Sequence, residues 1–199
     1  MGLSHYHGTG YNETIPAPLL WKIKNTLRPG YIRGYIYTWL SEAVSRFTGN
    51  PVLIGSLSIK FFKLDGQIVD YGVVSRRVVT TAFVNFMVDQ LQTETSEWGD
   101  FKYHDSGVGT TAAAVGNTDI ETTDGESRVA GTQVEGATAE IYKSVATITY
   151  TTTKAITEHG LFSKSTGSTL MDRSVFAALN VVATNQIQFS YELTVVSGG

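Results

Sequence analysis

Histidine is the residue type in this 199-residue sequence best suited to metal binding or proton transfer, and the chain has four. His5 and His7 are separated by one residue, so both could reach one metal ion from the same side of an extended chain. A metal site needs three or four ligands, however, and the sequence contains no HExxH motif. His104 and His159 could belong to a Ser–His–acid triad, whose members are distant in sequence, but no serine stands in a GxSxG motif. We therefore predict no metal site and no catalytic residue, and keep a hydrolase only as a lower-ranked alternative.

Two further patterns could bind a cofactor or an ion, but neither has the context that its chemistry needs. Gly107–Ala112 is superficially similar to the dinucleotide-binding fingerprint, which requires a preceding strand and a following helix in a parallel βαβ unit. The surrounding sequence indicates antiparallel strands instead. Asp119, Glu121, Asp124 and Glu126 could chelate Ca²⁺, but they lack the spacing of an EF-hand. We predict no cofactor, and we interpret these acids as part of a solvated loop.

The composition argues against several classes of protein. Cysteine is absent, so the chain can form neither a disulfide framework nor a thiolate metal site. The formal net charge of −3 and the pI of about 5.8 argue against a dedicated nucleic-acid-binding protein. No apolar run approaches the roughly 18 residues of a membrane span, and the first residues lack the apolar stretch of a signal peptide. We therefore expect no membrane partner and no specific nucleic-acid partner.

The first 50 residues combine aromatic and basic side chains with residues that interrupt helices. Residues 1–40 carry four basic and one acidic side chain, together with seven of the 22 aromatic residues of the chain. Prolines and glycines recur from Gly8 to Gly34, which predicts an extended arm. Its large apolar side chains need burial, either on the arm's own domain or, as the aromatic enrichment favours, on a neighbouring subunit. The candidate interface residues are Tyr6, Tyr11, Leu19, Leu20, Trp21, Tyr31, Tyr35 and Trp39.

Residues 51–199 have the alternating hydrophobicity of β-strands. Apolar and polar residues alternate over 56–61 and most clearly over 187–195, and strands are also expected over 141–153 and 175–182. Asp65-Gly66 predicts a hairpin turn, and the apolar spacing over 80–92 predicts a helix. Residues 105–140 form a long, polar, aromatic-free loop, while residues 35–48 fit either a strand or a helix. The sequence thus predicts a mainly β protein: an antiparallel β-sandwich over 51–199, with one α-helix and an extended N-terminal arm over 1–50.

Several segments in order along the chain resemble a known family. They are residues 78–83, 103–112, 117–119, 128–133, 155–162, 167–176 and 187–194, and the most specific are ITEHGLF and GSTLMDRSVF within the fifth and sixth. These segments resemble small virion structural proteins of tailed bacteriophages. The resemblance covers roughly residues 70–199 and does not include the arm. The resemblance implies a virion component that is not an enzyme. Such proteins decorate the capsid or lie at the head–tail junction or in the tail.

The expected function is that of a bacteriophage capsid decoration, or cement, protein that stabilises the head shell through its N-terminal arm. The expected partners are the major capsid protein or other virion proteins, together with further copies of the chain. A neck, tail or baseplate structural protein is the alternative, and a receptor-binding module using the loop at 105–140 is a third possibility. Glu158 and Arg173 flank one β-turn-β unit, and we expect them to form a structural ion pair.

Overall fold

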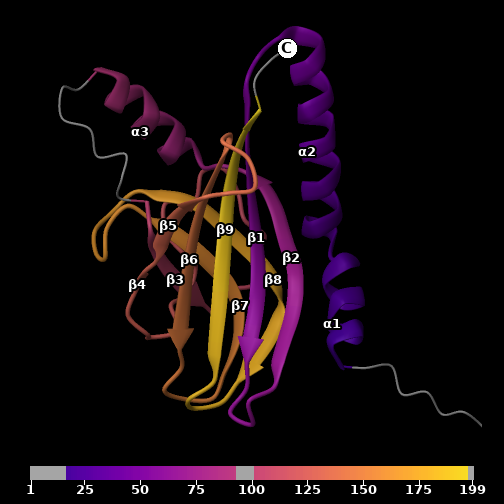
Figure 1. Ribbon diagram of the computed structural model, residues 1–199, viewed down its shortest axis with the longest axis vertical. Coiled ribbons are helices and arrows are strands. Elements are labelled where there is room, and N and C mark those ends of the chain that lie inside the picture. Colours follow the sequence, from indigo (N-terminus) through magenta and orange to yellow (C-terminus); the bar gives the residue numbers. More distant parts are fainter. Residues whose placement is uncertain (1–16, 93–100, 197–199) are drawn as a thin grey trace, which may run out of the picture.

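The computed structural model describes residues 17–92 and 101–196 and consists mainly of two antiparallel sheets packed together (Figure 1). One sheet has five strands in the order β2-β1-β9-β6-β5, and the other has four in the order β4-β3-β7-β8. The mainly β, two-sheet antiparallel architecture predicted from the sequence is therefore confirmed. The strands are β1 (Val52–Phe62), β2 (Ile68–Val78), β3 (Tyr103–Gly107), β4 (Val129–Ala130), β5 (Thr132–Glu135), β6 (Ile141–Thr149), β7 (Lys154–Phe162), β8 (Leu170–Val181) and β9 (Gln186–Val196).

The hydrophobic core lies between the sheets, where the alternating residues of the central strands meet. In the β1–β9 pair, Leu57 lies opposite Tyr191 and Ile59 opposite Phe189, and all four side chains are fully buried. Phe176 of β8 contributes to the same core from the four-stranded sheet. Because side chains on a strand point alternately to its two faces, this register buries the apolar set and leaves the serines and charged residues outside. The hairpin turn expected between β1 and β2 is present, with Gly66 at φ 81°.

The described residues form three helices, so the prediction of a single helix is wrong, and so is that of an extended arm over residues 17–48. The helices are α1 (Ala17–Thr26), α2 (Pro29–Thr48) and α3 (Thr81–Gln92). Helix α3 was expected, and residues 35–48 of α2 fitted either a strand or a helix. Pro29 occupies the first turn of α2, where a missing N–H costs nothing, so it begins the helix rather than breaking one. Gly49 ends α2 at φ 71°, and its N–H donates to the Ser45 carbonyl over 2.9 Å. Tyr6 and Tyr11 lie outside the described residues.

Helix α1 links the edge strands of the two sheets. Asn25, which is buried, donates from Nδ2 to the carbonyl of Val74 on β2 over 2.9 Å and accepts from the N–H of Ala177 on β8 over 3.0 Å. Trp21 donates its indole N–H to the Ala177 carbonyl over 2.9 Å. Unpaired backbone groups at the edges of β2 and β8 are thereby satisfied by side chains of the helix. Helix α1 is consequently part of the folded domain.

Helix α2 packs along β2 through its small and polar residues. Gly34, Thr38 and Ser45 are buried and lie on one side of the helix, at a spacing of four and seven residues. A Cβ atom on Gly34 would lie 2.3 Å from the carbonyl oxygen of Arg76, so the helix backbone approaches the strand closely at this point. This contact fixes which side of α2 faces the sheet, and most of the large apolar residues of the helix are left exposed.

Candidate interaction surface and buried polar network

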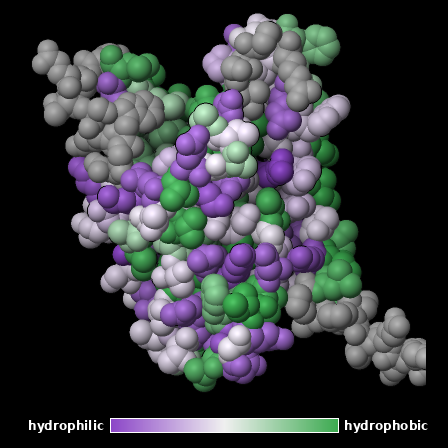
Figure 2. Space-filling view, in the orientation of Figure 1, coloured by the Kyte–Doolittle hydropathy of each residue, from purple (hydrophilic) through white to green (hydrophobic). Residues whose placement is uncertain are grey.

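The outward side of α1 and α2 carries an apolar surface. Phe47, near the end of α2, is 92% exposed, and Trp39 is 66% exposed. In Figure 2, hydrophobic side chains run along the right-hand edge of the molecule, where Figure 1 places the two helices. The exposed large apolar residues of the pair are Leu19, Leu20, Ile23, Leu27, Ile32, Tyr35, Ile36, Tyr37, Trp39, Leu40, Val44 and Phe47. We refer to this set as the helical apolar surface.

The area of the helical apolar surface is that of a protein interface. A large side chain offers roughly 150–250 Å², so twelve that are about half exposed present on the order of 1,000 Å². The largest apolar patch of a typical monomer is about 300–600 Å². A standard interface buries about 800 Å² on each partner. The summed exposed area of these side chains therefore exceeds the largest apolar patch of a typical monomer. It is comparable with the area that one partner buries in a standard interface.

A groove crosses the junction between α1 and α2 within this surface. It is lined by Leu27 of α1 and by Ile32, Arg33, Ile36, Tyr37 and Leu40 of α2. Arg33 is the one charged side chain among these lining residues. The two helices thus present a continuous apolar depression with a positive charge beside it, which suits the apolar ridge of a partner helix.

The structure separates the predicted interface residues into two groups. Leu19, Leu20, Tyr35 and Trp39 are exposed on the helical apolar surface. Trp21 instead packs within the chain, with its ring centroid 4.4 Å from that of Tyr71.

Tyr31 and Tyr35 form a small aromatic and basic cluster against β2. Tyr31 is partly buried, and its ring centroid lies 5.7 Å from that of Tyr35. The guanidinium of Arg76 lies 5.0 Å from the Tyr35 ring centroid, within the range of a cation–π contact. Tyr31 and Tyr35 therefore also help to hold α2 against the sheet.

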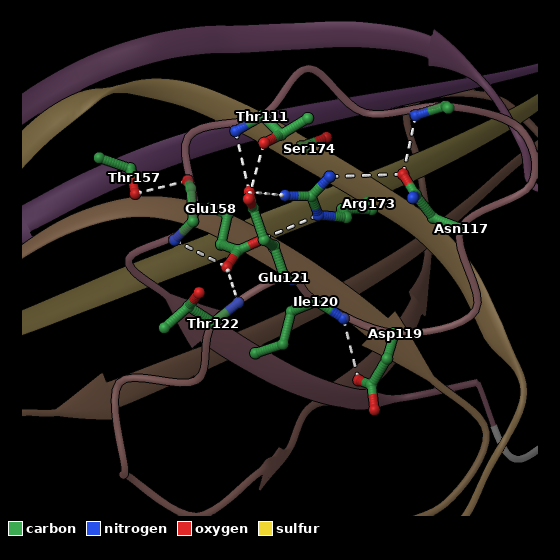
Figure 3. Close-up of polar contacts among 12 residues, drawn as sticks. Thr111, Asn117, Asp119, Ile120, Glu121, Thr122, Thr157, Glu158, Arg173 and Ser174 are labelled. Atoms are coloured by element: carbon green, nitrogen blue, oxygen red, sulfur yellow. Dashed lines mark hydrogen bonds and ion pairs between the residues drawn. The ribbon is translucent and has the colours of Figure 1, made fainter.

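Glu158 anchors the long loop after β3 (Figure 3). Its carboxylate, on β7, is fully buried and accepts the backbone N–H groups of Gly109, Glu121 and Thr122 at 2.9, 3.0 and 2.8 Å. The Arg173 Nε on β8 donates to the same carboxylate over 2.7 Å, so the expected pair forms a direct ion pair in the structure. A buried carboxylate is tolerable only when its lone pairs are satisfied in this way.

Arg173 extends the network to the outer turn of the loop. Its Nη2 donates to Glu121 over 3.1 Å, and its Nη1 donates to Asn117 over 3.4 Å. Glu121 in turn accepts the backbone N–H and the hydroxyl of Thr111, at 2.8 and 2.6 Å. The hydrogen bond from the Thr111 hydroxyl is the leading reason why the pKa of Glu121 lies below its ordinary value. Two segments of the loop are thus tied to β7 and to the edge strand β8 of the four-stranded sheet.

Other acids between residues 105 and 140 are also paired within the fold, so the interpretation as a solvated loop is wrong for Asp124 and Glu126. Asp105 accepts from Arg128 Nε over 3.0 Å, and Glu126 accepts from Lys154 over 2.8 Å. The Ser106 hydroxyl donates to Asp124 over 2.5 Å. In addition, the predicted loop contains the short strands β4 and β5. Its polar side chains are largely used inside the fold.

His104, His159 and Ser144 form a hydrogen-bonded chain in the interior. His104 Nδ1 lies 2.9 Å from His159 Nε2, and His104 Nε2 lies 2.8 Å from the Ser144 hydroxyl. His159 Nδ1 is buried without a hydrogen-bond partner. We assign the tautomers so that His159 Nε2 donates to His104 Nδ1 and His104 Nε2 donates to the Ser144 hydroxyl. His159 Nδ1 then carries a lone pair and no hydrogen, which costs less free energy than a buried N–H without an acceptor.

Burial of His104 and His159 keeps both imidazoles neutral. Burial lowers the pKa of His104 from 6.5 to about 3, and burial together with the neighbouring His104 lowers that of His159. Ser144 and both histidines are fully buried, so a substrate has no access to the hydroxyl. The serine–imidazole contact has the distance of a nucleophile and its base, but this burial favours a structural role.

No cluster of three or more His, Cys, Asp or Glu side chains within 17–92 and 101–196 is arranged to hold a metal ion. Among the helices of those same segments, none is both long enough and apolar enough to cross a membrane. Comparisons with protein families, with curated proteins and with solved structures found no match to the chain.

Proposed function

We propose that this chain is a structural component of a bacteriophage virion, and specifically a capsid decoration protein that stabilises the head shell. The observation that carries the proposal is the helical apolar surface, which has the area of an interface and lies on a folded domain. In place of an extended arm, two packed helices present the apolar side chains, so little conformational entropy is lost on docking. The proposed partners are the major capsid protein or another virion protein.

The loop after β3 supports a structural role over receptor binding. A receptor-binding loop offers polar and aromatic groups to its ligand, whereas the carboxylates of Glu121 and Glu158 are engaged within the fold. Residues 105–140 contain no aromatic side chain on which a sugar ring could stack. The resemblance of residues 70–199 to virion structural proteins points in the same direction.

The copy number of the chain in purified particles tests the proposal. Quantitative mass spectrometry against the major coat protein should give a simple, high ratio, such as one copy for each coat subunit or for each threefold position. A few to a dozen copies for each particle would instead support the neck, tail or baseplate alternative. Absence from purified particles would overturn the proposed virion role.

Add-back of purified protein to particles that lack it tests the surface directly. Deletion of residues 1–34 is unsuitable, because it also removes Trp21 and Asn25, which tie the helix to β2 and β8. The replacement Trp39→Asp changes only an exposed position and should weaken binding to particles. A matched change of exposed Leu64 to Asp, in the turn between β1 and β2, should leave binding unchanged. Equal binding of both variants would contradict the role of the helical apolar surface.

A further inference from the structure

Helix α3 carries a second exposed apolar stripe, on a different flank of the molecule. Val84, Val88 and Leu91 are exposed at a spacing of four and three residues, and Leu91 is 82% exposed. The helix buries Phe83 against the core, so these three residues form a narrow ridge beside the packed face. In Figure 1, α3 projects from the upper left, whereas α1 and α2 lie along the right-hand side. One chain therefore presents a groove and a ridge on opposite flanks.

The charges of the two regions have opposite sign. Residues 17–48 carry five basic side chains and one acidic side chain, a net charge of +4. Helix α3 carries one acidic side chain, Asp89, and no basic one, a net charge of −1. Opposite net charges favour encounter between these regions of two copies and select their relative orientation. Contact between the α1–α2 regions of two copies would instead bring like charges together.

The dimensions of the ridge and the groove also agree. Seven residues separate Val84 from Leu91, which corresponds to about 10 Å along a helix axis. The groove on α2 extends from Ile32 to Leu40, or about 12 Å. A ridge of side chains three and four residues apart is the shape that packs between the side chains of another helix.

We propose that the chain associates head to tail, with the α3 ridge of one copy in the α1–α2 groove of the next. Val84, Val88 and Leu91 would contact Ile36 and Leu40, and the positively charged α1–α2 region would lie against the negatively charged α3. Because each copy uses two different surfaces, every association leaves one groove and one ridge free. Such contacts generate a closed ring, or an open filament if the rotation does not close. Copies of the chain would associate in this way in solution, without attachment to a virion.

Two complementary variants of the full chain test this arrangement. A groove variant, Ile36→Asp with Leu40→Asp, retains the ridge, and a ridge variant, Val88→Lys with Leu91→Lys, retains the groove. All four positions are exposed, so each variant should fold, as circular dichroism and thermal unfolding would verify. Leu64→Asp serves as the matched surface control. Sedimentation velocity over a concentration series gives the size of each species.

The head-to-tail arrangement predicts a distinctive pattern. The wild-type chain and Leu64→Asp should form species larger than a dimer, whereas each interface variant alone should associate roughly tenfold more weakly or worse. An equimolar mixture of the two variants should form a dimer and nothing larger, because it contains one intact groove and one intact ridge for each pair. Added salt should weaken the wild-type association, because the attraction between opposite charges is screened.

Three results would overturn the inference. Wild-type protein that stays monomeric across the concentration series would exclude self-association. A ridge variant that associates as strongly as wild type would indicate contact between two α1–α2 surfaces. A mixture that shows no dimer would exclude the groove–ridge pairing. A monomeric chain that is nevertheless abundant in purified particles would overturn only this inference and leave the proposed virion role intact.

Discussion

Mild acid should destabilise the fold through the buried histidine pair. His104 and His159 are neutral in the folded chain because burial lowers the pKa of both imidazoles. In the unfolded chain each would titrate near its ordinary value of 6.5. Between these values the unfolded state binds more protons than the folded state, so stability must fall as the pH falls. The contribution is complete above pH 6.5 and, for His104, is lost progressively down to about pH 3.

The magnitude for His104 can be estimated from its pKa. At about pH 5 an unfolded imidazole is almost fully protonated, while His104, with a pKa of about 3, remains neutral. The free energy of unfolding then falls by about 2 kcal/mol relative to pH 7, since each pKa unit corresponds to about 1.4 kcal/mol. His159 adds a loss of the same sign. A domain with a total stability of about 5–15 kcal/mol would show this change clearly.

Denaturant unfolding at pH 7 and at pH 5 measures the effect, and two variants assign it. His104→Gln removes one titrating group and should reduce the difference in unfolding free energy between the two pH values. Ser144→Ala should lower stability at both pH values yet keep the difference, because both histidines remain. Lowered carboxyl pKa values, as at Glu121, contribute mainly below about pH 5, and His104→Gln leaves their contribution unchanged. Equal stability at both pH values in the wild type, or an undiminished difference in His104→Gln, would refute the reasoning.

Three substitutions test the packing contacts, each by its unfolding free energy. Arg173→Met leaves the Glu158 carboxylate buried without its cation and should cost about 3–5 kcal/mol, whereas a cost below about 1 kcal/mol would contradict the anchoring role. Asn25→Asp replaces a donor with an acceptor opposite a carbonyl of β2 and should cost about 2 kcal/mol or more, so an unchanged value would exclude that bridge. Gly34→Ala should destabilise despite the better helix propensity of alanine, because its Cβ meets a backbone carbonyl at 2.3 Å. Gly116→Ala, which has open space, is its control, and equal effects would remove the close-approach argument.

The strands were predictable because each has one face in the core and one in water. Tyr191 and Phe189 alternate with polar residues on β9, and two-residue periodicity identifies such a strand from its own sequence. The α3 helix was predictable for the corresponding reason, since Phe83 and its neighbours repeat at helical spacing. The Glu158–Arg173 pair could be expected from its position across one β-turn-β unit, but its three backbone donors could not. They come from a loop whose path depends on the folded sheet.

An extended arm was predicted for residues 17–34 from the presence of proline and glycine, although the position of these residues decides whether they interrupt a helix or delimit it. Pro29 and Gly49 are the usual residues at the beginning and just after the end of a helix, and together they indicated α2. The contacts of Asn25 could not be predicted, because they join strands about 50 and 150 residues away in sequence. The pairing of Glu126 could not be predicted either, because charge composition does not show whether a partner such as Lys154 lies nearby in the fold.

The orientation of α2 supports the proposal that this side of the chain binds another protein. Turning the helix over would bury its outward side chains, each worth roughly 1.5–3 kcal/mol. The sheet cannot accept them, because Gly34 brings the helix backbone against the carbonyl of Arg76 and leaves no room for a side chain. The sequence thus places glycine, threonine and serine where the sheet requires close approach, and places Ile36, Trp39 and Phe47 in water. In a monomer these exposed side chains contribute no hydrophobic stabilisation. Binding of another protein to the same face would bury them and gain that free energy on assembly.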